Sequence, residues 1–443
     1  MVSLDDMRRE ARAAFDAAVA AVQPRNLVPS QFQRDGSRVL VAGEMLPHPP
    51  GRRVVMAIGK AAPGLAAAWL ESIPEWGDEF FVLTPHGVTV TPELEKKATI
   101  LRGGHPYPDA AGEISTRELL GVAHSLGEND VLVVLISGGG SALLAAPKDG
   151  LRLDDIRATT DLLLKSGAPI NEINTVRRQL LAAAGGGLGR DASPAQVWTL
   201  VLSDVLGDAL QDIASGPTVP SPSTAADGLA VLDRRGLRPS VPPAVIEFLE
   251  SAADRSPDTG EWAAANSTHV IGNNRTAVNA AALELGSCGY EVEPAAESLV
   301  GEASDCGRDI AVAARQWEFP LARAVVYGGE TTVTVRGSGR GGRNQELALA
   351  AAIEIEDMQN IVVLAAGTDG IDGLSENAGA IVDPTTTLRL RQLGLDPQAM
   401  LANNDSGTAF EAAGDAVHTG PTGTNVCDLT LVLTAPTRNE LKG

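Results

Sequence analysis

Short, largely apolar runs that alternate with helix-forming stretches limit the fold of this 443-residue chain more than any other feature. Strands followed by helices are typical of a mostly parallel sheet that helices cover on both faces. The pattern therefore predicts an α/β fold. In the first part of the chain we expect strands at 53–58, 80–84, 131–136 and 197–202, and helices at 5–22, 61–70 and 175–184.

Pro, Ser, Asp and Gly residues concentrate between residues 234 and 262, around one short apolar stretch. This composition is typical of a connection between domains. A chain of 443 residues is also longer than those that usually fold around a single hydrophobic core. We therefore expect two α/β domains, residues 1–255 and a smaller one at 256–443. In the second domain we expect strands at 269–271, 324–327 and 361–365, and helices at 276–285 and from residue 344.

The formal net charge of the chain is -21, and only six of its residues are lysine. An acidic surface repels nucleic acid and anionic membranes, so neither is an expected partner. The amino terminus lacks the layout of a secretory signal, and no run approaches the roughly 20 apolar residues of a membrane span, which favours a cytoplasmic location. The cysteines form no CxxC pair and are expected to be reduced: Cys288, Cys306 and Cys427.

The segment 330–346 joins a β-branched run to a glycine-rich loop and then to a helix-forming stretch. Glycines let backbone N–H groups approach an anion, a helix start leaves N–H groups unpaired, and the planar forks of Arg340 and Arg343 suit phosphate oxygens. The segment predicts an anion site, the alternative being a solvated turn with basic flanks. Its glycines also fit a dinucleotide-binding pattern, although two arginines favour phosphoryl transfer. That pattern comprises Gly337, Gly339 and Gly342, with acids at Glu354, Glu356 and Asp357.

Two further segments with anion-binding chemistry follow expected strands. Lys60 follows 53–58, at the strand end where open α/β sheets bind ligands. The glycine- and serine-rich segment 137–141 follows 131–136, where successive N–H groups can form an anion nest. The alternatives are a solvent-exposed lysine and a tight strand-to-helix turn.

Carboxylates at strand ends can hold Mg²⁺ or accept a hydroxyl proton. Asp204, which follows 197–202, is the best candidate, whereas Asp208 and Asp212 could equally be first-turn helix acids. Asp369 and Asp372 follow 361–365 and could share a hydrated metal, although Asp-Gly pairs are also common in turns.

Near the carboxyl end, segment 419–426 again mixes small residues with hydroxyl and amide donors before an apolar strand. Both expected domains thus present anion binders and carboxylates at their strand ends. This predicts an active site in the cleft between them.

The chain resembles the class II glycerate 2-kinase family over nearly its whole length. The resemblance rests on segments in the family's order: 58–62, 104–106, 137–141, 173–177, 203–205, 214–218, 328–332, 341–346, 368–373 and 419–425. It implies a Rossmann-like amino-terminal domain, a smaller α/β domain, and ATP- and Mg²⁺-dependent phosphorylation of D-glycerate at its 2-hydroxyl, giving 2-phosphoglycerate. Because relatives are also named hydroxypyruvate reductases, an NAD(P)H-dependent reductase is the second hypothesis, and a binding protein without enzymatic activity is the third.

The resemblance also implies roles for single residues. Lys60 and Arg343 match the family's proposed catalytic cations, and Asp204 is expected to activate the hydroxyl or bind metal, with Asp369 and Asp372 as further metal candidates. Residues expected to bind substrate or nucleotide are Ser137, Gly138, Gly139, Gly140, Ser141, Glu330, Gly341, Gly342, Asn344 and Asn425. One departure is Ala184, which stands where the family usually has a lysine, so that one cationic contact is missing.

Abundant carboxylate with scarce lysine is typical of a protein from a salt-rich cytoplasm, the alternative being an acidic protein from a GC-rich genome. If it is a salt adaptation, the melting temperature should rise steadily from low to molar KCl, because salt screens like-charge repulsion. A flat or falling melting temperature in calorimetry would contradict a halophilic source.

Overall fold

A computed structural model describes residues 3–36, 38–256, 258, 260–317 and 322–436. The chain divides into two compact units, which we call the central unit, residues 24–271, and the terminal unit, residues 1–23 with 272–443. This division differs from the expected boundary after residue 255. Residues 256–271 belong to the central unit, and the first 23 residues belong with the second half of the chain.

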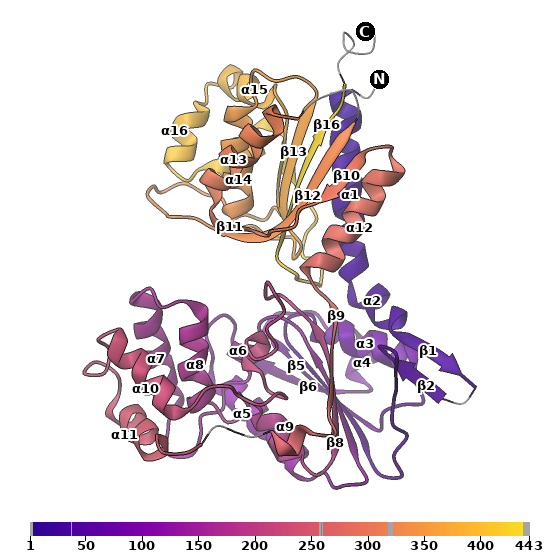
Figure 1. The fold of residues 1–443 in the computed structure, drawn as a ribbon, viewed down its shortest axis with the longest axis vertical. Coiled ribbons are helices and arrows are strands. Elements are labelled where there is room, and N and C mark those ends of the chain that lie inside the picture. The colour runs from indigo at the N-terminus through magenta and orange to yellow at the C-terminus, as the bar shows by residue number, and fades with distance from the viewer. Residues whose placement is uncertain (1–2, 37, 257, 259, 318–321, 437–443) are drawn as a thin grey trace. The chain divides into compact units, whose positions relative to one another are not determined.

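The central unit contains a six-stranded sheet in the order β6-β5-β4-β7-β8-β9, in which the pairs from β6 to β8 are parallel (Figure 1). Val54, Met56 and Leu132 are fully buried, as expected for strands whose two faces are both covered. The expected strands are thus confirmed, at β4 (Arg53–Ile58), β5 (Glu79–Pro85), β7 (Val131–Ile136) and β8 (Gln196–Leu202), with β6 (Thr99–Gly103) and β9 (Ser267–Gly272) beside them.

Helices cover this sheet, and a separate helical cluster with its own apolar core lies at one side. The covering helices include α3 (Ala62–Ser72), α5 (Ala110–His124), α6 (Gly140–Leu143) and α9 (Gly187–Ala192), and the cluster comprises α7 (Leu153–Lys165), α8 (Ile170–Leu180), α10 (Ala225–Arg234) and α11 (Pro243–Ala252). The expected connection at 234–262 contains α11, whose Val245 and Leu249 are fully buried in that cluster. The expected helix at 175–184 instead ends at Leu180, because Leu181 pairs with Pro147 in a β-bridge.

Three short elements complete the central unit. A small antiparallel sheet follows α2 (Pro24–Ser30), and α4 (Pro92–Glu95) is a single turn. The strands of the small sheet are β1 (Phe32–Asp35), β2 (Arg38–Val41) and β3 (Glu44–Met45).

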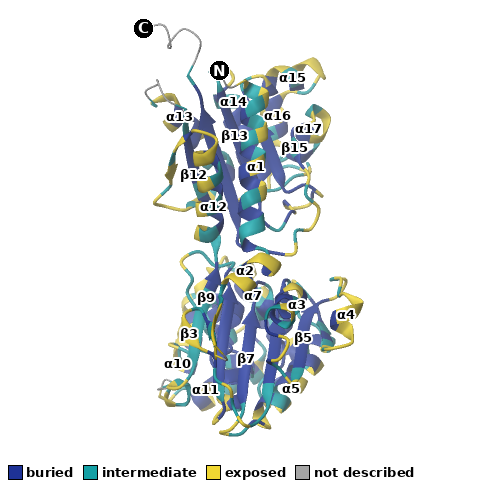
Figure 2. Cartoon of the chain, turned by 90° about the vertical axis from the view of Figure 1, so that its right-hand side faces the viewer, coloured by how far each residue is buried: buried dark blue, intermediate teal, exposed yellow. Residues whose placement is uncertain are grey.

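The terminal unit contains a mixed sheet in the order β10-β12-β16-β13-β14-β15, with β11 also pairing with β12. β10 and β11 run parallel to β12, and the remaining pairs are antiparallel. Its strands are β10 (Glu291–Pro294), β11 (Leu299–Glu302), β12 (Arg323–Thr332), β13 (Ile361–Gly367), β14 (Gly379–Val382), β15 (Ala416–Val417) and β16 (Asp428–Thr434). β13, β14 and β16 are buried along their whole length and are dark blue in Figure 2, whereas the residues of β10 and β11 are intermediate or exposed.

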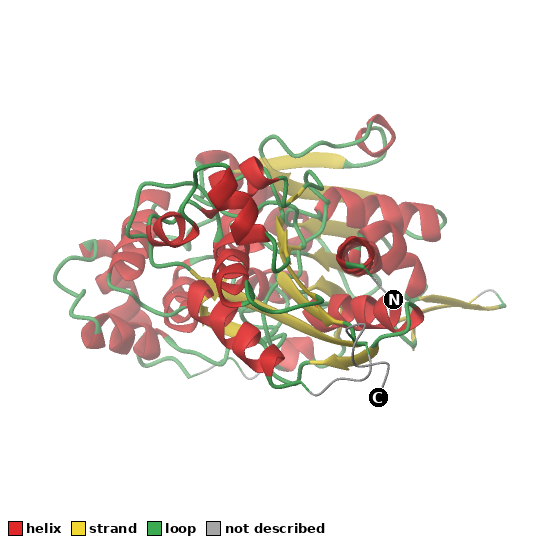
Figure 3. Ribbon diagram, turned by 90° about the horizontal axis from the view of Figure 1, so that it is seen from above, coloured by secondary structure: helices red, strands yellow, loops and turns green. Residues whose placement is uncertain are grey.

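Helices lie on both faces of the terminal sheet (Figures 1 and 3). One face carries α1 (Leu4–Val22) and α12 (Asn274–Ser287), and the other carries α13 (Ala303–Arg315), α14 (Arg343–Glu354), α15 (Thr386–Gln392), α16 (Pro397–Ala402) and α17 (Ser406–Ala413). In the described part of the chain, no helix has both the length and the apolar character needed to cross a membrane.

Arg8 ties α1 to the terminal unit through two buried carboxylates. It lies 2.6 Å from Asp383 and 2.6 Å from Asp415, whose side chains are only 4% and 3% exposed. Arg389 pairs with both acids as well. Burial acts to raise the pKa of Asp383, but hydrogen bonds from Thr385 and the charges of Arg389 and Arg8 outweigh it and hold that pKa below its ordinary value.

Arg8→Met should destabilise the terminal unit while keeping most of the packing of the stem. Removing one partner of a buried pair costs about 3–5 kcal/mol, and because Arg389 remains we expect about 2 kcal/mol in urea unfolding. The lowered pKa of Asp383 gives stability that is present above the unfolded value of about 3.9 and is lost as pH falls through the folded value, so the difference should shrink below about pH 4. Arg9→Met, at a side chain that is 71% exposed, is the matched control, and equal effects of both variants would contradict the account.

Candidate active site

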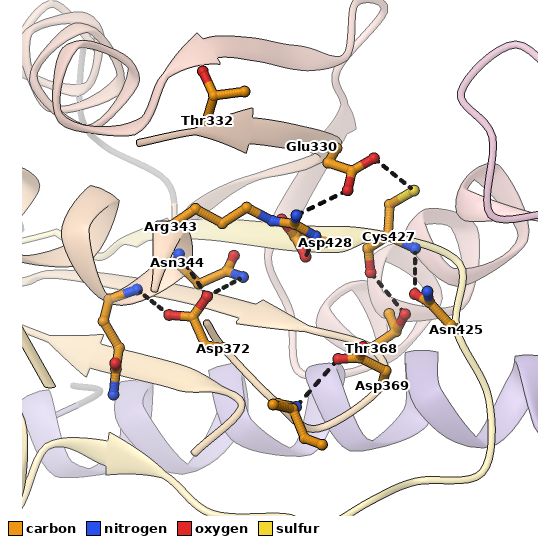
Figure 4. Close-up of polar contacts among 12 residues, drawn as sticks. Glu330, Thr332, Arg343, Asn344, Thr368, Asp369, Asp372, Asn425, Cys427 and Asp428 are labelled. Carbon is orange, nitrogen blue, oxygen red and sulfur yellow. Dashed lines mark hydrogen bonds and ion pairs between the residues drawn. The ribbon is translucent and has the colours of Figure 1, made fainter. Parts of the chain in front are cut away.

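The start of α14 is already paired with an internal anion. Gly342 is the N-cap residue and offers no side chain, and the carboxylate of Asp372 accepts hydrogen bonds in its place. Its oxygens accept from the backbone N–H groups of Asn344 at 3.1 Å and Gln345 at 2.7 Å, and from the side-chain amide of Asn344 at 3.2 Å (Figure 4). Two of the N–H groups on which the predicted anion site partly rested, those of Asn344 and Gln345, are therefore occupied by Asp372.

Asp372 is only 1% exposed. Burial raises its pKa to about 7, with a smaller contribution from the charge of Asp428, while the hydrogen bonds from Gln345 and Asn344 oppose the rise. A carboxylate that is buried and already bonded through both oxygens is well suited to fix a helix start. It is poorly suited to the metal-binding role expected from the sequence.

Arg343 is held by two carboxylates. Its Nε and Nη2 donate to the two oxygens of Asp428 at 2.5 and 3.0 Å, and its Nη1 lies 2.8 Å from Glu330 (Figure 4). Burial acts to lower the pKa of Arg343, but the hydrogen bonds and charge of Asp428, followed by the charge of Glu330, raise it above its ordinary value. The Asp428 side chain is 8% exposed and that of Glu330 46%, so Asp428 provides the fixed support and Glu330 the solvent-facing contact.

The backbone of the glycine-rich loop is hydrogen-bonded to the segment that joins α16 to α17. The side chain of Asn404 accepts from the N–H groups of Arg336 and Gly337, that of Asn403 from Ser338, and that of Asp405 from Arg340. Four backbone donors of this segment are thus engaged within the protein, and the N–H of Gly339, in the loop expected to cradle an anion, donates to the carbonyl of Asn403 at 3.0 Å.

The loop glycines serve close packing. A Cβ at Gly339 would lie 2.3 Å from Cβ of Asp405, and one at Gly342 would lie 2.4 Å from Oδ1 of Asp372. A larger residue would therefore displace the segment that holds the loop. The glycines at 339 and 342 are thus required for close packing, and the binding role expected of Gly341 and Gly342 stays a prediction.

Residues of this loop and of the neighbouring segments line two cavities, of about 480 Å³ and about 740 Å³. Arg343, Gly341, Gly342 and Asp369 line the larger one, together with apolar side chains such as Ile371. Its volume is within the roughly 300–1,000 Å³ of small-molecule sites, and it combines a fixed cation with an apolar wall. This cavity is the strongest candidate site in the terminal unit.

Two further predicted residues follow β13 and precede β16. Asp369 is partly exposed, and its Oδ1 accepts from the N–H of Ile371 at 3.1 Å. The side chain of Asn425 accepts from the N–H of Cys427 at 3.0 Å, and Cys427 has a left-handed φ of 67°. Asn425 therefore shapes the turn that leads to Asp428 (Figure 4).

In the central unit, the ends of β4 and β7 are bound to each other. The backbone N–H of Lys60 donates to the carbonyl of Gly138 at 2.9 Å, and that of Ala61 to the hydroxyl of Ser137 at 3.0 Å. A Cβ at Gly139, whose φ is 85°, would lie 3.0 Å from the ring of His105 and 3.2 Å from Cγ of Lys60. The left-handed backbone and the close approach both require glycine at 139.

His105 and Asp204 complete this group. Burial, followed by the charge of Lys60, lowers the pKa of His105 to about 4, so its ring is neutral at neutral pH. The carboxylate of Asp204 lies against Gly138, because a Cβ at that glycine would be 2.0 Å from Asp204 Oδ2. The structure thus brings together the predicted residues that follow β4, β7 and β8.

Asp208 and Asp212 could each be a site residue or a first-turn helix acid. Asp212 has a structural partner. It pairs with Arg178 at 2.9 Å and accepts from Asn174 at 3.2 Å. Across the described residues, no group of three or more His, Cys, Asp or Glu side chains is arranged to hold a metal ion.

A strained segment lies beside the 137–141 loop and was not predicted. Ala214 and Ser215 have φ values of 51° and 62°, which are unfavourable for residues with a side chain. Ser215 is hydrogen-bonded to Ser141 at 2.8 Å, and Arg177 donates to the carbonyl of Ser141 at 2.5 Å. Such strain persists where the surroundings fix it and is concentrated at functional sites.

Sequence reasoning also missed His105 and Asp428 as site residues. His105 stood in a segment that carried the resemblance, which is a usable signal. Asp428 immediately precedes an apolar run, and a lone acid at a strand start carries no distinctive pattern.

Comparisons with known proteins match nearly the whole chain. Residues 10–250 match a domain of unknown function, DUF4147, and residues 323–428 match the MOFRL family. A D-glycerate 2-kinase from Thermotoga maritima is 41% identical over 86% of this chain and 90% of its own length. A relative from Agrobacterium vitis, provisionally named a hydroxypyruvate reductase, is 39% identical over 96% of this chain and 94% of its own. The crystal structure of glycerate kinase from Thermotoga maritima superimposes with a TM-score of 0.85 at 37% identity, covering 97% of this chain and all of the other.

Asp372 should make the stability of the protein depend on pH. Its folded pKa of about 7 exceeds the unfolded value of about 3.9, so its favourable contribution is present below the unfolded pKa and is lost as pH rises through about 7. Asp372→Asn has no titrating group at this position. The free energy of unfolding of the wild type relative to this variant should therefore fall between about pH 4 and pH 7 in urea titrations, and a constant or rising difference would contradict the assignment.

Proposed function

The chain belongs to the glycerate 2-kinase family, and from this premise we propose that it transfers the terminal phosphoryl group of ATP to the 2-hydroxyl of D-glycerate. The products would be 2-phosphoglycerate and ADP. The observation that carries the proposal is Arg343, fixed by Asp428 and facing a cavity of about 740 Å³.

Phosphoryl transfer depends on in-line positioning and on neutralising charge, and it needs little covalent chemistry from the protein. A guanidinium group has five N–H donors. Asp428 engages two of them and Glu330 a third, which leaves donors for phosphate oxygens. In this proposal, Arg343 neutralises the negative charge of the transferred phosphoryl group, and Asp428 positions Arg343.

In this proposal, Glu330 pairs with Arg343 until a phosphate group replaces it. Its contact with Arg343 is solvent-facing, and exposed ion pairs contribute only about 0–1 kcal/mol. An incoming phosphate can therefore displace Glu330 at low cost, whereas the pair with Asp428 is largely buried and persists.

In the central unit, we assign to Lys60 a contact with phosphate oxygens and to the 137–141 loop the binding of an anionic group. Asp204 is the candidate acceptor of the hydroxyl proton, because a carboxylate at a strand end can reach a bound alcohol. His105 is neutral at neutral pH and so does not add a second positive charge beside Lys60.

Mg²⁺ in phosphoryl-transfer sites is usually held by one or two carboxylates together with substrate phosphates. The donors present fit this requirement: Asp369 lines the larger cavity and is partly exposed, and Asp204 is partly exposed in the central unit. When bound, the ion would neutralise charge on the phosphates. Asp372 is a weaker candidate, because both of its oxygens accept hydrogen bonds at the start of α14.

The geometry does not favour a nicotinamide-dependent reductase. A dinucleotide turn presents free N–H groups to pyrophosphate, whereas the N–H groups of Gly337 and Gly339 donate to Asn404 and Asn403. The cytoplasmic location and the salt-rich source stay predictions from the sequence.

An enolase-coupled assay tests the reaction and its position together. With D-glycerate, ATP and Mg²⁺, the protein should form a product that enolase dehydrates directly, because 2-phosphoglycerate is the substrate of enolase. A product that enolase accepts only after a mutase is added would contradict the position of transfer. Oxidation of NADH or NADPH by hydroxypyruvate at enzymatic rates, without ATP, would contradict the kinase assignment.

Arg343→Lys should lower kcat by roughly 10²-fold or more, although the charge is kept, because lysine cannot hold Asp428 and a phosphate through one planar fork. Arg340→Lys is the matched control in the same loop, since Arg340 is 58% exposed and pairs with Glu411 at the surface. Its steady-state rates should match those of the wild type. Equal rates for the two variants would exclude the proposed role of Arg343.

A further inference from the structure

A third cavity, of about 280 Å³, lies in the central unit and carries a concentration of positive charge that is unusual for this chain. Four cations line it, contributed by separate segments: Lys148 after the bridge at Pro147, Arg178 in α8, Arg190 in α9, and Arg255 after α11. Asp258 is the one acid among the described lining residues. In a chain with a net charge of -21, such a cluster requires a physical reason.

Structural ion pairs account for only half of these cations. Arg178 pairs with Asp212 at 2.9 Å, and Arg190 pairs with Asp258 at 2.5 Å and lies over the ring of Trp262. Among the described residues, neither Lys148 nor Arg255 has a carboxylate within ion-pair distance. Nζ of Lys148 instead lies 3.4 Å from the backbone carbonyl of Arg178.

Without a bound anion, it is energetically unfavourable to bury the charged amine of Lys148 near two other cations. Burial, followed by the charges of Arg190 and Arg255, lowers its pKa to about 8, which still leaves it protonated at neutral pH. A bound anion would offset both the burial and the repulsion among the cations.

Hydroxyl groups supply the remaining polar surface of this cavity. Ser221, Ser223 and Thr224 line it on the turn that leads into α10. The Ser223 carbonyl accepts from Gln179 at 2.9 Å, and its hydroxyl lies 3.4 Å from Nε of Arg178, so the turn is fixed against α8. Lysine and arginine cations together with hydroxyl donors match the several oxygens of a phosphate group.

We propose that this cavity binds a small phosphate dianion, free or as a monoester, at a site separate from the residues assigned to phosphoryl transfer. The volume of about 280 Å³ lies just below the roughly 300–1,000 Å³ of ligand sites, which restricts the occupant to a small molecule. The site is also hydrogen-bonded to the 137–141 loop. The N–H of Gly185, in the cavity wall, donates to the carbonyl of Ser215, whose hydroxyl is bonded to that of Ser141.

Calorimetric titration of the full chain with orthophosphate and with methyl phosphate, at constant ionic strength in chloride, tests the proposal. Saturable binding of orthophosphate alone would support a site for free phosphate, and binding of both would support a monoester site. Lys148→Met keeps the stem and removes the charge, and it should weaken binding at least tenfold. Arg255→Gln, at an exposed residue whose replacement leaves the core intact, should weaken binding as well and secures the test if Lys148→Met fails to fold.

Lys165→Met is the matched control, because Lys165 is an exposed lysine in the last turn of α7 and does not line the cavity. It should bind phosphate as tightly as the wild type. Three results would overturn the proposal: no saturable binding to the wild type, binding that persists unchanged in both the Lys148 and the Arg255 variants, or equally tight binding of succinate, a dianion without a tetrahedral phosphate.

Discussion

The ion pair between Arg343 and Asp428 fixes the geometry on which the candidate site of the terminal unit depends. It joins the first residue of α14 to the first residue of β16, two elements separated by 85 positions in the chain. Asp428 is largely buried and β16 lies between β12 and β13 inside its sheet, so the guanidinium group is held by a strand that is paired on both sides. A cation fixed in this way loses little entropy on meeting a phosphate, which is the condition for electrostatic stabilisation of a phosphoryl group.

The glycine-rich loop supports this arrangement in a different way from the one its composition suggested. Its glycines allow contact with Asp405 and Asp372, and most of its N–H groups are already paired. Asp372 then accepts the hydrogen bonds of two N–H groups at the start of α14. Arg343 lines the larger cavity together with Gly341 and Gly342, so in our proposal the guanidinium group is the main contact of this loop with a ligand anion.

Local patterns in the sequence predicted the strands and their functional ends well. β4 and β7 match the expected ranges, and Lys60, Gly138 and Asp204 lie together because parallel strands end at one edge of a sheet. Long-range contacts could not be predicted in this way. The assignment of α1 to the terminal unit depends on Arg8 reaching Asp383 and Asp415, and the role of Asp428 depends on its pairing with Arg343. Neither contact produces a periodic or compositional pattern in the sequence. The helix α11 was not predicted because the Pro-rich sequence around it is typical of a connection between domains.

The most direct test of the central claim is a double-mutant cycle between Arg343→Lys and Asp428→Asn, measured as kcat/KM for D-glycerate phosphorylation. If Asp428 acts by holding Arg343, Asp428→Asn should lower kcat/KM by roughly 10-fold or more in the wild type and by much less in the Arg343→Lys background, because residues that act as one unit are not additive. Equal losses in the two backgrounds would show that the two residues act independently and would contradict the account.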